Sequence, residues 1–234
     1  MGEGITKRIR ISLQEDGFSL RMVGRLGGEL TRFSSKALMR QGLRKAGVNH
    51  ATQIFSYTNA SELQTLYQLA SACPEGGTIL EIGSHLGAST CYLGAGIRKR
   101  GGMLFCVDTW NNETMAEGRM DTFEGFQHNT AGLRGMIKPI RKRSAELVRE
   151  DIRSPLDLVF IDGDHTYEAV KGDFETIRPW LADKAVIAFH DTVAFEGVCR
   201  VLGEILTTCE FRLVGHISNL SWVERRSPKK ALKL

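Results

Sequence analysis

Polar side chains follow two apolar runs of the chain, at the point where each run ends. They are Asp162, Asp164 and His165 after Leu156–Ile161, and His190 and Asp191 after Val186–Phe189. If the two runs are neighbouring parallel strands, these groups emerge at the same edge of a sheet. Carboxylates and an imidazole gathered there can hold a divalent cation, which would align and acidify a hydroxyl of a second molecule.

We predict that Asp162, His190 and Asp191 are the metal ligands, with Asp164 as an alternative to Asp162. His165 is then free to act as general base, because an imidazole with a pKa near about 6.5 suits proton removal at neutral pH. A purely structural interpretation stays open. In it Asp162 caps the next helix, His190 packs against the sheet and Asp191 forms a turn.

A glycine loop follows the first apolar run, from Glu81 to Gly87. Gly83 and Gly87 would let the backbone approach a ligand closely, but their G-x-x-x-G spacing differs from that of dinucleotide sites. Glu81 would repel a pyrophosphate, whereas it could bind the cationic methionine end of S-adenosylmethionine. Asp108 ends the second run, 27 residues after Glu81. A carboxylate at that place can accept hydrogen bonds from both ribose hydroxyls of the cofactor. The alternative is a tight strand–helix turn without a ligand.

Apolar runs alternate with helical patterns along most of the chain. The predicted strands are Thr78–Ile82, Met103–Val107, Met136–Ile140, Leu156–Ile161, Ala185–Phe189, Phe211–Val214 and His216–Val223. A helix with Ser61 as its N-cap precedes the first strand. Further helices are predicted at 88–100, 119–131, 144–151, 166–181 and 195–208. This alternation favours one α/β domain, a doubly wound and mostly parallel seven-stranded sheet with helices on both faces.

The charge of the chain is unevenly distributed. Residues 1–50 carry ten Lys or Arg and four acids, although the net charge of the whole chain is only +4. We therefore expect a basic, mostly helical extension over 1–60, the main domain over 61–224 and a basic tail over 225–234. The extension is expected to pack on the domain or on a second subunit, which favours a homodimer or higher homo-oligomer.

The composition excludes several classes of protein. The five cysteines are scattered and several lie in apolar runs, which indicates reduced, buried thiols. No stretch has the roughly 20 apolar residues of a membrane span, and the start lacks the apolar core of a signal peptide, so a cytoplasmic protein is expected. No aromatic residues are interleaved with the basic ones, so no nucleic-acid partner is expected.

Four motifs resemble those of one enzyme family. They are Glu-Ile-Gly-Ser-x-x-Gly-x-Ser-Thr from Glu81, Val-Asp-Thr-Trp from Val107, Ile-Asp-Gly-Asp-His-x-Tyr-Glu-x-Val from Ile161 and His-Asp-Thr from His190. The sequence resembles class I methyltransferases of the macrocin O-methyltransferase and cephalosporin hydroxylase-like group over roughly 75–215. That group is more distantly similar to catechol O-methyltransferase. The resemblance implies a Rossmann-like fold and S-adenosylmethionine as cofactor.

The resemblance also implies roles for individual residues. The residues that would contact the cofactor are Glu81, Gly83, Ser84, Gly87 and Ser89 at the methionine end, Asp108 at the ribose, Thr109 and Trp110 beside the adenosine, Ser144 and Ala145 against the adenine, and Asp162, which would also contact the metal. His190 and Asp191 fall where relatives place a metal pair, which in many of them is two acids or an acid and an amide. His165 falls where catechol O-methyltransferase-like enzymes place their catalytic lysine. Catalysis would then rest on His165 and Asp162.

The sequence thus favours an S-adenosylmethionine-dependent O-methyltransferase that is assisted by a divalent metal such as Mg²⁺. Its acceptor would be a hydroxyl of a small molecule, such as a sugar or a glycoside-like natural product, and the stretch 111–134 would form a lid over it. A non-catalytic accessory protein that binds S-adenosylmethionine is the first alternative. A metal-dependent hydrolase that uses His190-Asp191 as a dyad is a remote one, since such dyads sit on helices.

Overall fold

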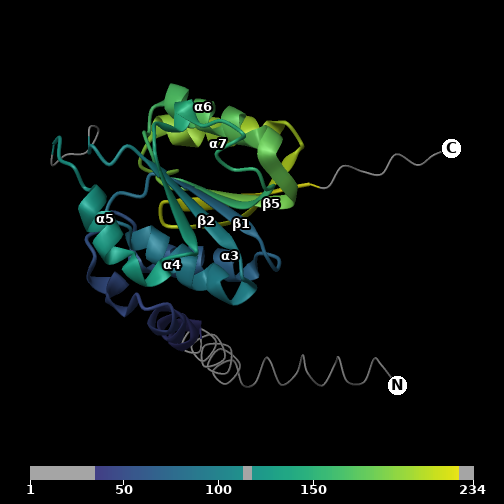
Figure 1. Cartoon of the computed structure of the whole chain (residues 1–234). Coiled ribbons are helices and arrows are strands. Elements are labelled where there is room, and N and C mark those ends of the chain that lie inside the picture. Colours follow the sequence, from purple (N-terminus) through teal and green to yellow (C-terminus); the bar gives the residue numbers. More distant parts are fainter. Residues whose placement is uncertain (1–34, 113–117, 227–234) are drawn as a thin grey trace, which may run out of the picture. The chain divides into compact units, whose positions relative to one another are not determined.

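The computed structural model describes residues 35–112 and 118–226 (Figure 1). The chain divides into two compact units, Met1–Gln41 and Gly42–Leu234. Residues 35–41, the described part of the first unit, are helical. The predictions for 1–34 and 227–234 lie outside the described residues. The domain boundaries at residues 60 and 224, and the homo-oligomer, therefore stay predictions.

The second unit is built on a seven-stranded sheet with the order β3-β2-β1-β4-β5-β7-β6. Its strands are β1 (Thr78–Ile82), β2 (Met103–Asp108), β3 (Ile137–Arg141), β4 (Leu156–Ile161), β5 (Leu181–Phe189), β6 (Phe211–Ile217) and β7 (Leu220–Arg225). β1 to β5 run parallel, whereas β7 pairs antiparallel with both β5 and β6. The predicted fold class, a mostly parallel seven-stranded α/β sheet, is confirmed.

Helices cover both faces of this sheet (Figure 1). They are α3 (Ala60–Ala72), α4 (Ala88–Ile97), α5 (Phe123–Asn129), α6 (Tyr167–Ile177) and α7 (Glu196–Thr207). α6 and α7 lie on one face, and α3, α4 and α5 lie on the other. Strand order reverses between β1 and β4, so the loops that follow these two strands flank the switch point where such sheets bind ligands.

Successive side chains of the central strands serve opposite halves of the core. On β4, Val159 and Ile161 are buried with residues of α6 and α7, whereas Leu158 and Phe160 are buried with residues of α3 and α4. A strand that is covered on both faces favours apolar residues at most positions, because its side chains alternate between the faces. This tendency explains why the runs are mainly apolar, with Glu81 in β1 and Asp157 in β4 as exceptions, and it fixes the register in which the polar residues leave the sheet.

Several predicted elements differ from the observed ones. The helix predicted at 119–131 begins only at Phe123, and the strand predicted at His216–Val223 is β7, Leu220–Arg225, while His216 and Ile217 belong to β6. The helix predicted at 144–151 is only a 3₁₀ turn, Ser144–Glu146.

The N-cap of the first helix lies two residues before the predicted Ser61, because it is Asn59, whose side chain accepts from the backbone N–H groups of Ser61 and Glu62. Glu62 in turn accepts from the backbone N–H of Asn59, which completes a capping box.

The five cysteines are all unpaired, as predicted, but only three of them are buried. Cys73, Cys91 and Cys106 lie in the core, whereas Cys199 and Cys209 are exposed. Across residues 35–112 and 118–226, no helix combines the length and the apolar character that a bilayer crossing demands.

Candidate active site

The polar residues predicted to converge lie at the carboxyl edge of the central strands. The backbone N–H of Asp162 donates to the carbonyl of Ile82 at 2.8 Å, and that of His190 donates to the carbonyl of Ile161 at 3.0 Å. These bonds extend the pairing of β4 with β1 and of β5 with β4 by one residue. The prediction that both clusters emerge at one edge is therefore confirmed.

Asp162, His165 and Asp191 bring their side chains to one point. His165 Nε2 lies 3.0 Å from Asp191 Oδ2 and 4.0 Å from Asp162 Oδ1. One ligand atom from each of the three residues lies within 4.8 Å of the others, which suits a shared cation. Asp191 holds a left-handed backbone with φ +58°, a conformation that costs free energy unless its surroundings impose it. This group contains His165, where the sequence had predicted His190.

His190 approaches the same carboxylates from the protein interior. Its Nδ1 lies 3.0 Å from Asp162 Oδ1 and 3.3 Å from Asp191 Oδ2, and its side chain is only 2% exposed. On the opposite side of the ring, Nε2 lies 3.2 Å from Oε2 of Glu62 on α3. Glu62 is not among the predicted site residues, because no sequence pattern indicates a contact between two residues that are 128 positions apart.

His190-Asp191 directly follows strand β5, so a dyad carried on a helix is excluded. Asp164, the alternative ligand, is exposed and accepts a hydrogen bond from the backbone N–H of Thr166 at 2.8 Å. It takes no part in the group that converges on one point.

The cluster stabilises positive charge on both imidazoles. Contacts with Asp162 and Asp191 raise the pKa of His165 to about 9, against a smaller opposing effect of burial. Burial lowers the pKa of His190, but the same two carboxylates outweigh it and raise that pKa to about 11. Burial alone would raise the pKa of Asp191, yet both imidazoles hold it well below its usual range. The prediction that His165 has the ordinary pKa of an imidazole is therefore wrong.

The donor atoms fit a divalent cation. Among the described residues, His165 Nε2 and His190 Nδ1 are buried nitrogens without a hydrogen-bond partner, although each faces carboxylate oxygens. Imidazole nitrogen and carboxylate oxygen are common ligands of divalent ions, and a bound ion would take the place of the protons on these rings.

Glu81 lies completely inside the protein, beneath the glycine loop. It accepts hydrogen bonds from the hydroxyls of Ser84 at 2.8 Å, Ser89 at 2.6 Å and Thr90 at 2.5 Å. Burial raises the pKa of Glu81 to about 7, and the three hydroxyls oppose this effect only in part. Glu81 thus anchors the loop to α4, and its predicted contact with a cofactor stays a prediction.

The glycines of the loop are required by the protein itself. Gly83 has φ +85°, and a Cβ on it would lie 2.0 Å from the backbone oxygen of Asp162. A Cβ on Gly87, also at φ +85°, would lie 2.7 Å from Thr130 Cγ2. The close approach at Gly83 is therefore to the loop after β4, which couples the glycine loop to a candidate metal ligand.

Asp108 holds the glycine loop from the end of β2. Its Oδ2 accepts from the backbone N–H groups of Ser84 and His85, both at 2.8 Å, and its Oδ1 accepts from that of Trp110 at 2.7 Å. A carboxylate has about four acceptor positions, so the half-buried Asp108 retains capacity for a ribose hydroxyl.

Trp110 is fully buried between Phe123 and Phe126, with ring centroids 4.8 Å from each. Its indole nitrogen donates to the carbonyl of His85 at 3.0 Å. The indole therefore has no free face for an adenosine, and it supports the loop from within. Thr109 beside it is half-buried, as is Ser144, whereas Ala145 is exposed at the end of β3.

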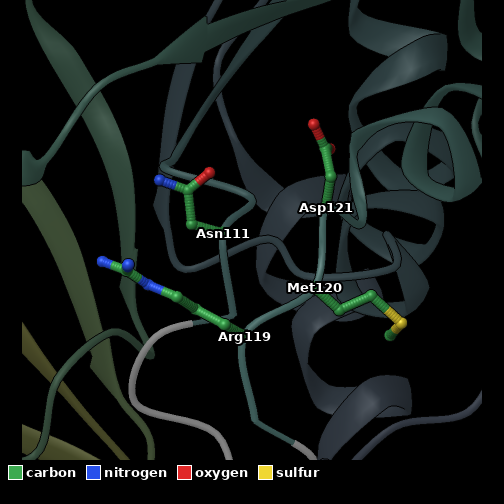
Figure 2. A pocket seen from close by; sticks show the side chains of 4 residues that line it. All are labelled: Asn111, Arg119, Met120 and Asp121. Atoms are coloured by element: carbon green, nitrogen blue, oxygen red, sulfur yellow. The ribbon is translucent and has the colours of Figure 1, made fainter.

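A cavity of about 400 Å³ lies beyond the end of β2, and no motif in the chain predicts it. Figure 2 shows its lining residues Asn111, Arg119, Met120 and Asp121, and the backbone N–H of Met120 donates to the carbonyl of Asn111. Arg141, at the end of β3, donates to Asp121 at 2.7 Å and fixes this side of the cavity. The predicted lid at 111–134 includes these residues, α5 and the 3₁₀ turn Ala131–Leu133, while its residues 113–117 lie outside the described part.

Comparison with known proteins identifies the family of this region. Residues 80–192 match the family model Methyltransf_24, described as a methyltransferase domain. The "Uncharacterized protein y4gI" of Sinorhizobium fredii is 34% identical over 118 residues, which are 49% of this chain. The chain spans only 13% of the length of that relative.

Solved structures share the fold at low sequence identity. The cofactor-bound Rv0187 from MTB has a TM-score of 0.60 and 17% identity, covering 83% of this chain and 91% of that one. The O-methyltransferase TomG from Streptomyces achromogenes, in complex with SAM, has a TM-score of 0.58 and 18% identity, covering 80% and 90%. The chain is therefore similar to a methyltransferase domain in sequence over residues 80–192, and to these structures in fold over most of its length.

Proposed function

We propose that this protein is a class I methyltransferase, which transfers the methyl group of S-adenosylmethionine to a hydroxyl of a small molecule with the help of a divalent cation. The observation that carries the proposal is the convergence of Asp162, His165 and Asp191 beside the glycine loop, at the switch point of the sheet. The sulfonium of S-adenosylmethionine supplies an already activated methyl group, so the protein has mainly to align the acceptor and remove its proton.

The cofactor would lie along the carboxyl ends of β1, β2 and β3. Glu81, Gly83, Ser84, Gly87 and Ser89 would form the methionine end of the site. Asp108 would bind the ribose with its remaining acceptor capacity, and Thr109 would lie beside it. Ser144 and Ala145 would border the adenine. The cavity at Asn111 and Asp121, at the ends of the same strands, supports this placement.

We assign the two histidines to different tasks. His190 is 2% exposed and held on both nitrogens, which suits a fixed ligand alongside Asp162 and Asp191. The side chain of His165 is 30% exposed, so its ring lies at the open side of the site, while its Nε2 is buried and faces the carboxylates that would hold the ion. A bound divalent ion such as Mg²⁺ would polarise the acceptor hydroxyl and lower its pKa. His165 Nε2 would take that proton, because an ion held by Asp162, His190 and Asp191 would repel the proton of His165 and leave its Nε2 lone pair free.

The acceptor would rest on apolar side chains beside His165. The ring of Phe195 stacks on the His165 imidazole with centroids 4.2 Å apart, and it is 43% exposed. Val193 nearby in the chain is 69% exposed. An apolar surface next to a base suits the carbon face of a sugar or a glycoside-like natural product. The description of TomG as an O-methyltransferase of tomaymycin synthesis supports such an acceptor.

Calorimetry followed by a transfer assay tests this function. We expect the protein to bind S-adenosylmethionine, and then to move radiolabel from its methyl group to members of a panel of hydroxylated small molecules. Transfer should require a divalent cation and fall when the cation is chelated. Binding of S-adenosylmethionine without transfer to any acceptor, with or without cation, would instead indicate an accessory protein.

Asp191→Ala should abolish methyl transfer and leave the affinity for S-adenosylmethionine within a few-fold of the wild type. The reason is that Asp191 lies at the candidate ion and not among the loop residues expected to hold the cofactor. Asp183→Ala is the matched control, because Asp183 is an exposed residue near the beginning of β5, the strand that Asp191 follows. Equal loss of transfer and of cofactor binding in folded Asp191→Ala would contradict a role at the ion.

A further inference from the structure

Glu62 on α3 is buried against the candidate metal cluster, outside the matched region 80–192. Its side chain is 1% exposed, and its Oε2 lies 3.2 Å from His190 Nε2. A carboxylate seldom lies in the core without partners, because burial penalises its charge. The partners of Glu62 therefore indicate what it does there.

Two backbone groups fix the carboxylate of Glu62 independently of His190. The N–H of Asn59 donates to Oε2 at 2.7 Å, and the N–H of Asn219, in the turn between β6 and β7, donates to Oε1 at 2.8 Å. Both donors belong to the backbone, so the carboxylate cannot rotate without losing one of them. Glu62 thus presents a fixed acceptor to His190 Nε2.

This acceptor determines which nitrogen of a neutral His190 carries the proton. An imidazole nitrogen that faces a fixed carboxylate donates its proton to it, which leaves a lone pair on the other nitrogen. That other nitrogen is Nδ1, which lies 3.0 Å from Asp162 Oδ1 and 3.3 Å from Asp191 Oδ2. Nδ1 is buried and, among the described residues, has no hydrogen-bond partner.

We propose that Glu62 is a positioning residue that holds His190 with its proton on Nε2, so that Nδ1 serves as a nitrogen ligand beside Asp162 and Asp191. The inference rests on the proposed function, because it concerns the cation of the same site. It further implies that this cation is one that accepts imidazole, such as Co²⁺, Mn²⁺ or Zn²⁺, in preference to Mg²⁺, which favours oxygen ligands.

Titration calorimetry with Co²⁺ alone and with Mg²⁺ alone tests the metal preference. The wild-type protein should bind Co²⁺ more tightly than Mg²⁺. Glu62→Gln removes the negative charge that holds the proton on Nε2, and its single amide oxygen can accept from only one of the two backbone N–H groups. The affinity for Co²⁺ should then fall by about 10- to 100-fold, the usual effect of removing the partner of a metal-binding histidine.

Asn59→Ala is the matched control for helix capping. Asn59 caps the same helix. Its side chain accepts from the backbone N–H groups of Ser61 and Glu62, and it takes no part in the contact between the Glu62 carboxylate and His190. This variant should lower the melting temperature of the protein but keep the affinity for Co²⁺. In a His190→Asn background, Glu62→Gln should cause no further loss of affinity for Co²⁺, because the two residues act through one contact.

A direct readout is the protonation of His190 in protein labelled with ¹⁵N-histidine and loaded with Zn²⁺. We expect long-range ¹H–¹⁵N spectra to show a proton on Nε2 and a metal-bound Nδ1. A proton that stays on Nδ1 at saturating Zn²⁺, or unchanged Co²⁺ affinity in His190→Asn, would overturn the proposal. Neither result involves S-adenosylmethionine, so the proposed methyl transfer could fail or succeed separately.

Discussion

At the scale of single residues, the site depends on carboxylates whose surroundings differ. Asp191 is held ionised by two imidazoles, whereas Glu81 is surrounded by neutral hydroxyls in a fully buried position. Hydroxyls stabilise a carboxylate less than a full positive charge does, so burial prevails and the pKa of Glu81 rises to about 7. Glu81 therefore changes its charge near neutral pH, directly beneath the loop that is expected to hold a sulfonium.

Replacing Glu81 by Gln should change how stability depends on pH. The pKa of Glu81 is about 7 in the folded protein and 4.5 in the unfolded chain, so the folded state binds the proton more tightly. The stabilisation is fully present below pH 4.5 and is lost as the pH rises through 7. Over that interval the wild type should lose about 3 kcal/mol of unfolding free energy relative to Glu81→Gln.

Urea denaturation at a series of pH values measures this difference. Glu75→Gln is the matched control, since Glu75 is exposed and its curve should run parallel to that of the wild type. Parallel curves for Glu81→Gln and the wild type would show that Glu81 keeps the same charge in both states.

At the scale of elements, the edge of the sheet is a set of strained loops packed on one another. His85, Trp110, Asn112 and Asp191 all have positive φ, and they follow β1, β2 and β5. Non-glycine residues hold this conformation only where their surroundings impose it. The hydrogen bonds from Ser84, His85 and Trp110 to Asp108 are part of that constraint.

Gly83→Ala should disturb both loops at once. A Cβ at residue 83 would meet the Asp162 backbone oxygen at 2.0 Å, so the loop after β4 has to move. Gly76→Ala is the matched control, because Gly76 also has positive φ, +66°, but nothing lies within 4 Å of its added Cβ. The control should lose about 1–2 kcal/mol from strain alone. Gly83→Ala should lose about 1–3 kcal/mol more from overpacking.

Thermal unfolding and Co²⁺ titration of both variants check this prediction. Gly83→Ala should also bind Co²⁺ more weakly, because Asp162 is displaced, whereas Gly76→Ala should bind it normally. Equal destabilisation of the two variants would mean that the loops do not press on one another.

The elements differ in how far their sequence predicts them. The central strands could be predicted, because burial on both faces favours mainly apolar runs such as Leu158–Ile161 of β4. The segment 144–151 has helix-forming residues, but tertiary contacts prevail there. Asp151 accepts from the Val148 N–H and pairs with Lys142, and Arg149 donates to the carbonyls of Ile152, Arg153 and Ser154. Local propensity cannot report such contacts.

The candidate site shows the same division. Asp162, His165 and Asp191 could be predicted, because a polar residue directly after a buried strand has to emerge at its carboxyl end. Glu62 could be found only as the third residue of an N-terminal capping box, and its contact with His190 depends on how α3 packs. The motif around Trp110 predicts a contact with the cofactor, but the rings of Phe123 and Phe126 enclose its indole.

At the scale of the whole molecule, the glycine loop and the candidate ion site are connected through one residue, Asp162. Asp162 meets Gly83 through its backbone and faces the cluster through its side chain. Its own N–H donates to the carbonyl of Ile82, the last residue of β1. A ligand that orders either loop therefore orders part of the other site, and two such sites are thermodynamically coupled.

We predict that S-adenosylhomocysteine and Co²⁺ bind with positive cooperativity. The dissociation constant of Co²⁺ should fall by at least about fivefold when S-adenosylhomocysteine is saturating, the lower end of ordinary coupling between sites. Calorimetric titrations measure it in both orders of addition. Coupling is reciprocal, so saturating Co²⁺ should lower the dissociation constant of S-adenosylhomocysteine by the same factor. Gly76→Ala should preserve the factor, and Gly83→Ala should reduce it toward one. Identical dissociation constants with and without the second ligand would mean that Asp162 transmits nothing between the two loops, and that their contact serves packing alone.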